Sequence, residues 1–333
     1  MNNPTQLEEE YTLVIDLGNS SLRVGIINMT SQEITYLNMF NQYGKVQTLG
    51  NIAGDKTYGV ENCATGHRYI VGNLADSLIP RVEWQLSSQA RITSKTINFV
   101  ERVFALASEV VSQNSLVNLI VLEPQEAYLD TSDIPNEGTE INLLINKKPY
   151  TFRIKCVEFR PETLGSFNVL RNRINLQPHE KVLQIDVGTG TLIASIRDGL
   201  NNDYKPIVKD RLGLIHVLTK VVALPQYSKI AGITTRTILN SILRDNFVLP
   251  NGISFKEDFQ QAVMEWAAEI VQESREIFSN HGSSLSALCF TGGASRYLVS
   301  FLPPGTQFVY DHETNLRGAV KAFLDNENAN AKN

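Results

Sequence analysis

The sequence predicts an α/β protein built from two related halves, each with a glycine-rich turn at the end of a buried strand. Strand and helix patterns alternate along most of the chain, which favours this class over a helical bundle or a β-sandwich. The motif IDLGNSSL at residues 15–22 returns as IDVGTGTL at residues 185–192, and positions 16 and 186 are 170 residues apart. A duplicated domain, with one turn from each half facing a central cleft, would give this spacing.

The elements can be assigned in chain order. Residues 12–15, 21–27 and 119–122 predict strands, and apolar residues at helical spacing predict helices over 94–111 and 256–278 with core-facing stripes. Residues 141–145 and 150–159, joined through 146–149, predict a β-hairpin. Residues 287–290 predict a strand, followed by a third glycine-rich turn and a helix. The first ten residues and the Asn-rich stretch after Leu324 lack periodicity and are expected to be frayed ends.

Composition narrows the class further. The chain has 333 residues, 42% hydrophobic and 20% charged, as in a globular protein with two modest domains. A net charge of −5 argues against direct nucleic-acid binding, which needs clustered Lys and Arg. Cys63, Cys156 and Cys289 are widely separated and predict reduced thiols. The acidic residues 8–10 and the lack of a long apolar segment predict a cytoplasmic protein without a transmembrane segment.

The two repeated turns have the chemistry of a phosphate site. We call residues 18–20 loop one, residues 188–191 loop two and residues 292–294 loop three. Glycine allows close backbone approach, and backbone N–H groups and small hydroxyls donate to an anion. Asp16 and Asp186, at the strand ends, could hold Mg²⁺ through its water shell, and Arg23 could reach the phosphates. Either turn alone also fits an ordinary β-turn; the matched pair favours phosphate binding.

Loop three follows the same logic. Thr291 and the two glycines after it come after an apolar strand, and a backbone without side chains could lie against a purine or its α-phosphate. A plain turn is the alternative for this short motif.

Taken together, these motifs resemble the phosphate-one, phosphate-two and adenosine motifs of the actin, sugar-kinase and heat-shock-chaperone superfamily. Within it, the chain is similar to the ParM (StbA) family of bacterial actin-like proteins over about residues 11–324. The supporting segments are residues 150–155 and 157–162, with Pro161 and Glu162, residues 212–217, and residues 315–318 before a final helix. Thr163 and Asn19 stand where the family has serine and a small hydroxyl residue.

The resemblance implies an actin-like fold of two duplicated ribonuclease-H-like domains, residues 11–180 and 181–325, around a central nucleotide cleft, with the last helix packing back on the first domain. It implies ATP, or GTP, with Mg²⁺ held by Asp16 and Asp186, and Glu162 orienting the attacking water. The implied nucleotide contacts are Gly18, Asn19, Ser20, Arg23, Gly188, Thr189, Gly190, Thr191, Gly292, Gly293 and Ala294. The helix with Glu265, Glu269 and Glu273 lies where the family contacts ribose, although these carboxylates also fit a solvated face.

The implied function is an ATPase that assembles into filaments, with a small DNA-binding adaptor of the ParR type as partner and a role in plasmid partition or as a cytoskeletal element. Two alternatives stay open. Loops one and two also resemble type III pantothenate kinases, and a non-dynamic cell-shape or cell-division scaffold could share the fold. Residues 41–62 and 224–251 are candidate tip segments for filament contacts or passive loops.

Overall fold

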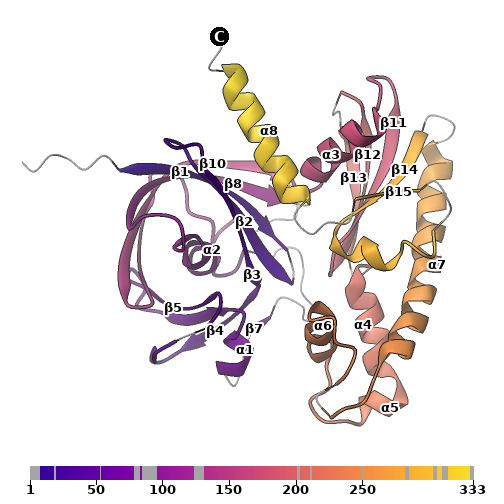
Figure 1. Cartoon of the computed structure of the whole chain (residues 1–333), viewed down its shortest axis with the longest axis horizontal. Coiled ribbons are helices and arrows are strands. Elements are labelled where there is room, and N and C mark those ends of the chain that lie inside the picture. Colours follow the sequence, from indigo (N-terminus) through magenta and orange to yellow (C-terminus); the bar gives the residue numbers. More distant parts are fainter. Residues whose placement is uncertain are drawn as a thin grey trace, which may run out of the picture. The chain divides into compact units, whose positions relative to one another are not determined.

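The computed structural model describes residues 8–18, 20–52, 54–78, 83–84, 96–123, 131–200, 203–210, 212–249, 251–281, 285–302, 306–309 and 314–330 (Figure 1). The chain falls into two compact units. Unit one is Met1–Leu164 with Ala319–Asn333, and unit two is Gly165–Gly318. Each unit combines a sheet with helices, so the predicted α/β class is confirmed. The domain limits of 11–180 and 181–325 remain predictions.

Unit one contains, among its described residues, a ten-stranded sheet in the order β3-β2-β1-β8-β10-β9-β5-β6-β4-β7. Its strands are β1 (Glu9–Leu17), β2 (Ser21–Asn28), β3 (Ile34–Phe40), β4 (Gln42–Val46), β5 (Thr57–Asn62), β6 (Arg68–Gly72), β7 (Glu83–Trp84), β8 (Asn114–Glu123), β9 (Glu140–Ile145) and β10 (Lys148–Pro161). Helices α1 (Ala75–Leu78) and α2 (Phe99–Ala107) belong to the same unit. The strands predicted at 12–15, 21–27 and 119–122 are confirmed as parts of β1, β2 and β8.

Helix α2 forms the centre of unit one's core. It packs against β2 and β3 and also against β5, β6 and β9, so the sheet curves around it (Figure 1). Phe104 on α2 is buried against Phe152, with ring centres 4.6 Å apart. The helix is shorter than the predicted 94–111, because Asn98 has a left-handed backbone (φ 52°) that precedes its first turn. Ile97 belongs to the apolar stripe predicted for 94–111 and was expected in the core; this was wrong, because Ile97 precedes the helix and is exposed.

The predicted β-hairpin is confirmed as β9 and β10. Ile145 pairs with Lys148, and the two turn residues, Asn146 and Lys147, both have positive φ, 49° and 69°. Such two-residue turns match the right-handed twist of the strands that they join. Beyond the hairpin, β10 continues parallel to β8 as far as Pro161, which brings the chain to Glu162.

Unit two contains a five-stranded sheet in the order β13-β12-β11-β14-β15, counted over the residues described. Its strands are β11 (Lys181–Val187), β12 (Thr191–Asp198), β13 (Asp203–Asp210), β14 (Leu285–Thr291) and β15 (Gln307–Val309). The helices that follow Leu164 along the chain are α3 (Leu164–Ile174), α4 (Leu214–Ala223), α5 (Pro225–Ser228), α6 (Thr235–Leu243), α7 (Lys256–His281), the 3-10 helix Gly293–Tyr297 and α8 (Thr314–Asn330).

The repeated motif marks a repeated sheet. In unit one, β1 pairs antiparallel with β2 and parallel with β8, β3 pairs antiparallel with β2, and β10 pairs parallel with β8. In unit two, β11 to β15 repeat this pattern in the order β13-β12-β11-β14-β15. Even the register repeats, because Asp16 faces Arg23 and Asp186 faces Ile193, each partner shifted by 170 residues.

Helix α7 confirms the longest helix prediction. Its stripe of Phe259, Val263, Trp266 and Ile270 is buried, and Trp266 donates its Nε1 hydrogen to the carbonyl of Leu212 at 2.9 Å. The helix expected after loop three is instead the 3-10 helix Gly293–Tyr297.

Residues 9–10 and 325–330 belong to regular elements, whereas the sequence predicts frayed ends there. Strand β1 already begins at Glu9, and α8 includes residues 315–318 and continues to Asn330, so the expected frayed tail after Leu324 is wrong for residues 325–330. Buried Leu316 and Val320 anchor the first half of α8, and an anchored helix extends more readily than an isolated one forms.

Gly318 makes the close packing of α8 possible. A Cβ atom there would lie 2.1 Å from the carbonyl oxygen of Gly165 at the start of α3, and Asn315 accepts a hydrogen bond from the N–H of Ser166 at 3.2 Å. The three cysteines are free, and Cys289 is buried. Within the part of the chain that the structure describes, no helix is long and apolar enough to cross a bilayer.

Candidate functional site

Loop one connects β1 to β2 at the point where Leu17 pairs with Leu22. A Cβ atom on Gly18 would lie 2.7 Å from the carbonyl oxygen of Ser21, so the tight turn requires glycine. Ser20 is buried. Asn19, predicted as a contact, lies outside the described residues. The structure therefore gives a compact turn whose shape depends on the absence of a side chain at position 18.

Asp16 and Arg23 contact each other directly. They occupy facing positions on β1 and β2, and Arg23 Nη1 lies 2.6 Å from Asp16 Oδ2. The Asp16 side chain is only 3% exposed and that of Arg23 17%. A charge-assisted contact of this kind, largely out of water, is stronger than a surface pair. Two residues predicted to act on metal and phosphate thus form an ion pair at the base of loop one.

Loop two connects β11 to β12 as loop one connects β1 to β2, and it is also held by helix α4. Val187 pairs with Leu192, and the N–H of Gly188 donates to the carbonyl of Thr191 at 2.9 Å. Helix α4 begins directly against the loop: Leu214 N–H donates to Gly188 O at 3.1 Å, and Ile215 N–H donates to Thr189 O at 2.7 Å. The loop carbonyls therefore cap the N-terminus of α4.

Gly213 permits this contact. A Cβ atom there would lie 2.7 Å from the carbonyl oxygens of Gly188 and Thr189. In a planar trans peptide group the C=O and N–H bonds point in opposite directions. Because the two carbonyls face α4, the N–H groups of Thr189 and Gly190 point away from it, as in the backbone nests that bind anions.

Asp186 is held differently from Asp16. The hydroxyl of Thr291, on the neighbouring strand β14, donates to Asp186 Oδ2 at 2.7 Å. Gln184 Nε2 donates in turn to the Thr291 hydroxyl at 3.1 Å and to the Ser166 hydroxyl at 2.9 Å. All four side chains are buried. A carboxylate fixed by such a network is oriented in advance for a ligand. This role of Thr291 could not be predicted from the sequence, since the contact depends on strand pairing.

Loop three lies against the strand that leads into loop two. Gly292 has φ +87°, and a Cβ atom there would lie 2.6 Å from the carbonyl oxygen of Val187. Gly293 and Ala294 begin the 3-10 helix, and Ala294 is buried. The structure thus brings loop two, loop three and Asp186 together within unit two, as it brings loop one, Asp16 and Arg23 together within unit one.

Glu162 lies at the end of the sheet where β1 leads into loop one. It follows the last residue of β10, its N–H donates to the carbonyl of Glu123 at 2.6 Å, and its side chain is half-buried. Strands β1, β8 and β10 are parallel neighbours, so Asp16, Glu123 and Glu162 all lie at the carboxyl ends of these strands. Strand spacing puts the chain at Glu162 roughly 10 Å from that at Asp16. Glu123, a buried carboxylate between them, was missed by the sequence analysis.

The predicted metal ligands are the carboxylates of Asp16 and Asp186. Among the residues that the structure describes, no three or more His, Cys, Asp or Glu side chains gather as a metal cluster. Mg²⁺ usually keeps several waters and binds one or two carboxylates together with substrate phosphates. Asp186, with its orientation fixed by Thr291, fits that kind of site.

Three carboxylates of α7 were considered for a ribose contact. Two of them, Glu265 and Glu269, accept hydrogen bonds from Lys220 of α4 at 3.4 and 2.8 Å, and Glu269 also lies 3.0 Å from His216. The Lys220 ammonium group helps to lower the pKa of Glu269, against the effect of burial. These contacts join α7 to α4.

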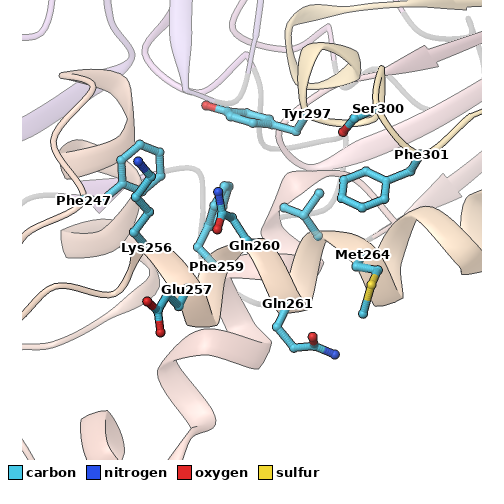
Figure 2. A pocket seen from close by; sticks show the side chains of 11 residues that line it. Phe247, Lys256, Glu257, Phe259, Gln260, Gln261, Met264, Tyr297, Ser300 and Phe301 are labelled. Atoms are coloured by element: carbon cyan, nitrogen blue, oxygen red, sulfur yellow. The ribbon is translucent and has the colours of Figure 1, made fainter.

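A cavity of about 550 Å³ lies within unit two, between α7 and the end of the 3-10 helix that begins in loop three (Figure 2). Tyr297, at the end of the 3-10 helix, and Phe301 lie across from the side chains of α7, and the Tyr297 and Phe259 rings meet edge to face at 5.4 Å. Its lining residues are Phe247, Lys256, Glu257, Phe259, Gln260, Gln261, Val263, Met264, Tyr297, Ser300 and Phe301. Aromatic walls with a few polar groups suit a small flat ligand.

Comparison with known proteins identifies the fold class. No family model and no curated protein matches the chain. Solved structures match it over nearly its whole length, and the chain has the actin-like fold. Those it resembles include ParM proteins and other bacterial and archaeal actin homologues.

Three of these structures illustrate the similarity. A 15-stranded ParM filament from Clostridium botulinum is 14% identical, with a TM-score of 0.71, covering 94% of this chain and 98% of that one. The archaeal actin homologue Ta0583 in complex with ADP is 13% identical, with a TM-score of 0.69 and coverage of 95% and 99%. The actin-like protein Alp7A is 11% identical, with a TM-score of 0.69 and coverage of 98% and 99%.

Proposed function

We propose that this chain is a nucleotide-hydrolysing actin-like protein that assembles into filaments, similar to ParM. The observation that carries the proposal is the repeated strand-turn-strand unit: loops one and two occupy equivalent positions in two sets of five strands that pair in the same order, β3-β2-β1-β8-β10 and β13-β12-β11-β14-β15. Filament formation is supported by the similarity to the ParM filament, and nucleotide binding by the similarity to Ta0583 with ADP.

In this proposal the three loops hold one nucleotide. Gly18, Asn19, Ser20 and Arg23 contact the β- and γ-phosphates. Gly188, Thr189, Gly190 and Thr191 bind the phosphate tail from the other side, and Gly292, Gly293 and Ala294 border the adenosine. The outward-pointing N–H groups of loop two support the phosphate contacts, and the aromatic cavity at Tyr297, the end of the 3-10 helix that begins in loop three, supports the adenosine contact.

Asp16 and Asp186 are proposed to hold Mg²⁺ through water, and the metal would neutralise charge on the phosphates. Glu162 is proposed to orient the attacking water. Glu162 lies at the same carboxyl-terminal end of the parallel strands as loop one. This position supports the role, because phosphoryl transfer depends mainly on positioning and charge stabilisation.

The wider biology follows from the same proposal. We expect a cytoplasmic protein that uses ATP, with GTP as the other candidate, in two domains near residues 11–180 and 181–325. A small DNA-binding adaptor of the ParR type would link filaments to DNA in plasmid partition; without such an adaptor, a cytoskeletal role is the alternative.

The first experiment is right-angle light scattering of the purified chain on addition of Mg-ATP, Mg-ADP or Mg-GTP, with phosphate release followed in parallel. We expect scattering to rise with ATP and to fall as phosphate appears. Phosphate release without a rise would contradict assembly. Neither signal with any nucleotide would contradict the proposal and favour the kinase or scaffold alternatives.

Replacing Asp186 with asparagine tests the metal assignment. We expect affinity for Mg-ATP to fall by about tenfold or more, since a charged oxygen that supports the metal is lost. Affinity measured in EDTA should stay at the wild-type level. Asp198→Asn makes the same change at the far end of β12 and should leave both affinities unchanged. Wild-type metal dependence in Asp186→Asn would remove Asp186 from the site.

A further inference from the structure

Asn41, a residue that none of the motifs includes, makes two hydrogen bonds to loop one. Asn41 follows β3 directly and is fully buried. Its backbone N–H donates to Ser20 O at 3.1 Å, and its side-chain Nδ2 donates to Gly18 O at 2.8 Å. Two carbonyls of loop one are therefore turned toward Asn41. Because the C=O and N–H of a peptide group point in opposite directions, these contacts help to fix which backbone groups the loop presents on its other side.

Arg102 in turn fixes the amide of Asn41. It lies on α2, is fully buried, and donates from Nη1 to Asn41 Oδ1. Its Nε donates to the carbonyl of Asn98 at 3.4 Å, and its guanidinium carbon lies 5.2 Å from the centre of the Tyr43 ring. With its oxygen bound to Arg102, the amide must direct its nitrogen toward Gly18. The orientation of this amide is thus set by a guanidinium group on a different element.

Burying an arginine at this position in the core is energetically unfavourable. Taking a guanidinium out of water is unfavourable, and burial lowers the pKa of Arg102 to about 10, although the group remains charged at neutral pH. An apolar side chain of similar volume would fill such a space with no charge to desolvate. The hydrogen bond to Asn41 gives one reason for an arginine at this position.

We propose that Asn41 and Arg102 are positioning residues that keep loop one in the shape that accepts the terminal phosphates of a nucleotide. The proposal rests on the proposed function, because it assumes that loop one binds phosphate. Neither residue touches the ligand. Their effect should consequently depend on whether the ligand carries β- and γ-phosphates, and a purely structural role would not show that dependence.

The test is Asn41→Asp, which keeps the size of the side chain and the acceptor for Arg102 but replaces the donor to Gly18 O with a carboxylate oxygen. We expect affinity for ATP and ADP, each measured by calorimetry at fixed Mg²⁺, to fall by about tenfold or more, as for one lost hydrogen bond plus repulsion. Affinity for adenosine should change by less than about twofold, since its binding gains nothing from loop one.

Two further variants complete the design. Asn118→Asp removes a side-chain donor from β8, where Asn118 Nδ2 donates to Glu10 Oε1 at 2.9 Å, and should leave all three affinities unchanged. Arg102→Lys keeps the positive charge but loses the planar guanidinium group. It should lower the affinity for ATP more than the affinity for adenosine.

An equal loss for ATP and adenosine in Asn41→Asp, or no loss for ATP, would overturn the positioning role. If the wild-type chain binds none of the three ligands, the proposed function fails instead.

Discussion

Replacing Glu162 with glutamine is expected to slow nucleotide hydrolysis by about 100-fold or more while leaving nucleotide affinity unchanged. The carboxylate would orient the attacking water, and glutamine keeps the shape but not the charge. Glu162 follows a β10 strand fixed by its pairing with β8, and its N–H is bonded to Glu123, so the backbone at this position should stay in place. Phosphate release after a single turnover is the measurement, and filaments of the variant should persist longer.

Glu158→Gln provides the matched control for this experiment. Glu158 lies on the same strand, is exposed, and pairs with Arg160 at 2.7 Å. The same substitution there should leave hydrolysis at the wild-type rate. A Glu162→Gln protein that releases phosphate as fast as the wild type would exclude Glu162 from the reaction.

Gly292→Ala is expected to have the largest effect on folding. The substitution places a Cβ atom 2.6 Å from the carbonyl oxygen of Val187 and forces alanine into a backbone with φ +87°. Strand β11 cannot yield easily, because it pairs with β12 on one side and β14 on the other. We expect a loss of about 3 kcal/mol in the free energy of unfolding, from backbone strain and overpacking together. Denaturant unfolding measures it.

Gly252→Ala separates these two contributions. Gly252 also has positive φ, +84°, but a Cβ atom there meets nothing within 4 Å. It should cost about 1 kcal/mol, the penalty for the left-handed backbone alone. Equal losses in the two variants would show that the approach of loop three to Val187 is not tight, and would contradict the packing described above.

The sequence predicted those parts of the fold that depend on local patterns. The buried runs of β1 and β11, the helical stripe of α7 and the hairpin joined through residues 146–149 are each set by neighbouring residues, and all were confirmed, the turn itself being shorter, at residues 146–147. The sequence pattern gave wrong predictions where the structure of a residue depends on packing with distant parts of the fold. Ile97 has helical spacing but precedes the helix, and residues 325–330 lack an apolar stripe but continue a helix anchored elsewhere.

For the candidate site, too, the sequence predicted only the residues that belong to local motifs. Its glycines and aspartates could be found because the motif occurs twice and its chemistry is contained in a few consecutive residues. The groups that hold them could not. Asn41 was placed in a candidate tip segment, yet it is buried against loop one, 23 positions along the chain from Gly18. Thr291 and Gly213 likewise act through strand pairing and helix packing, which no local pattern reports.

The shared register of the two halves also reveals an electrical asymmetry. The position that faces the strand-end aspartate holds a cation, Arg23, in one half and an aliphatic side chain, Ile193, in the other. Asp16 is consequently matched by a charge of opposite sign, whereas the Asp186 carboxylate is oriented by the neutral hydroxyl of Thr291. The same backbone pattern thus places an ion pair behind loop one and a hydrogen bond between a hydroxyl and a carboxylate behind loop two.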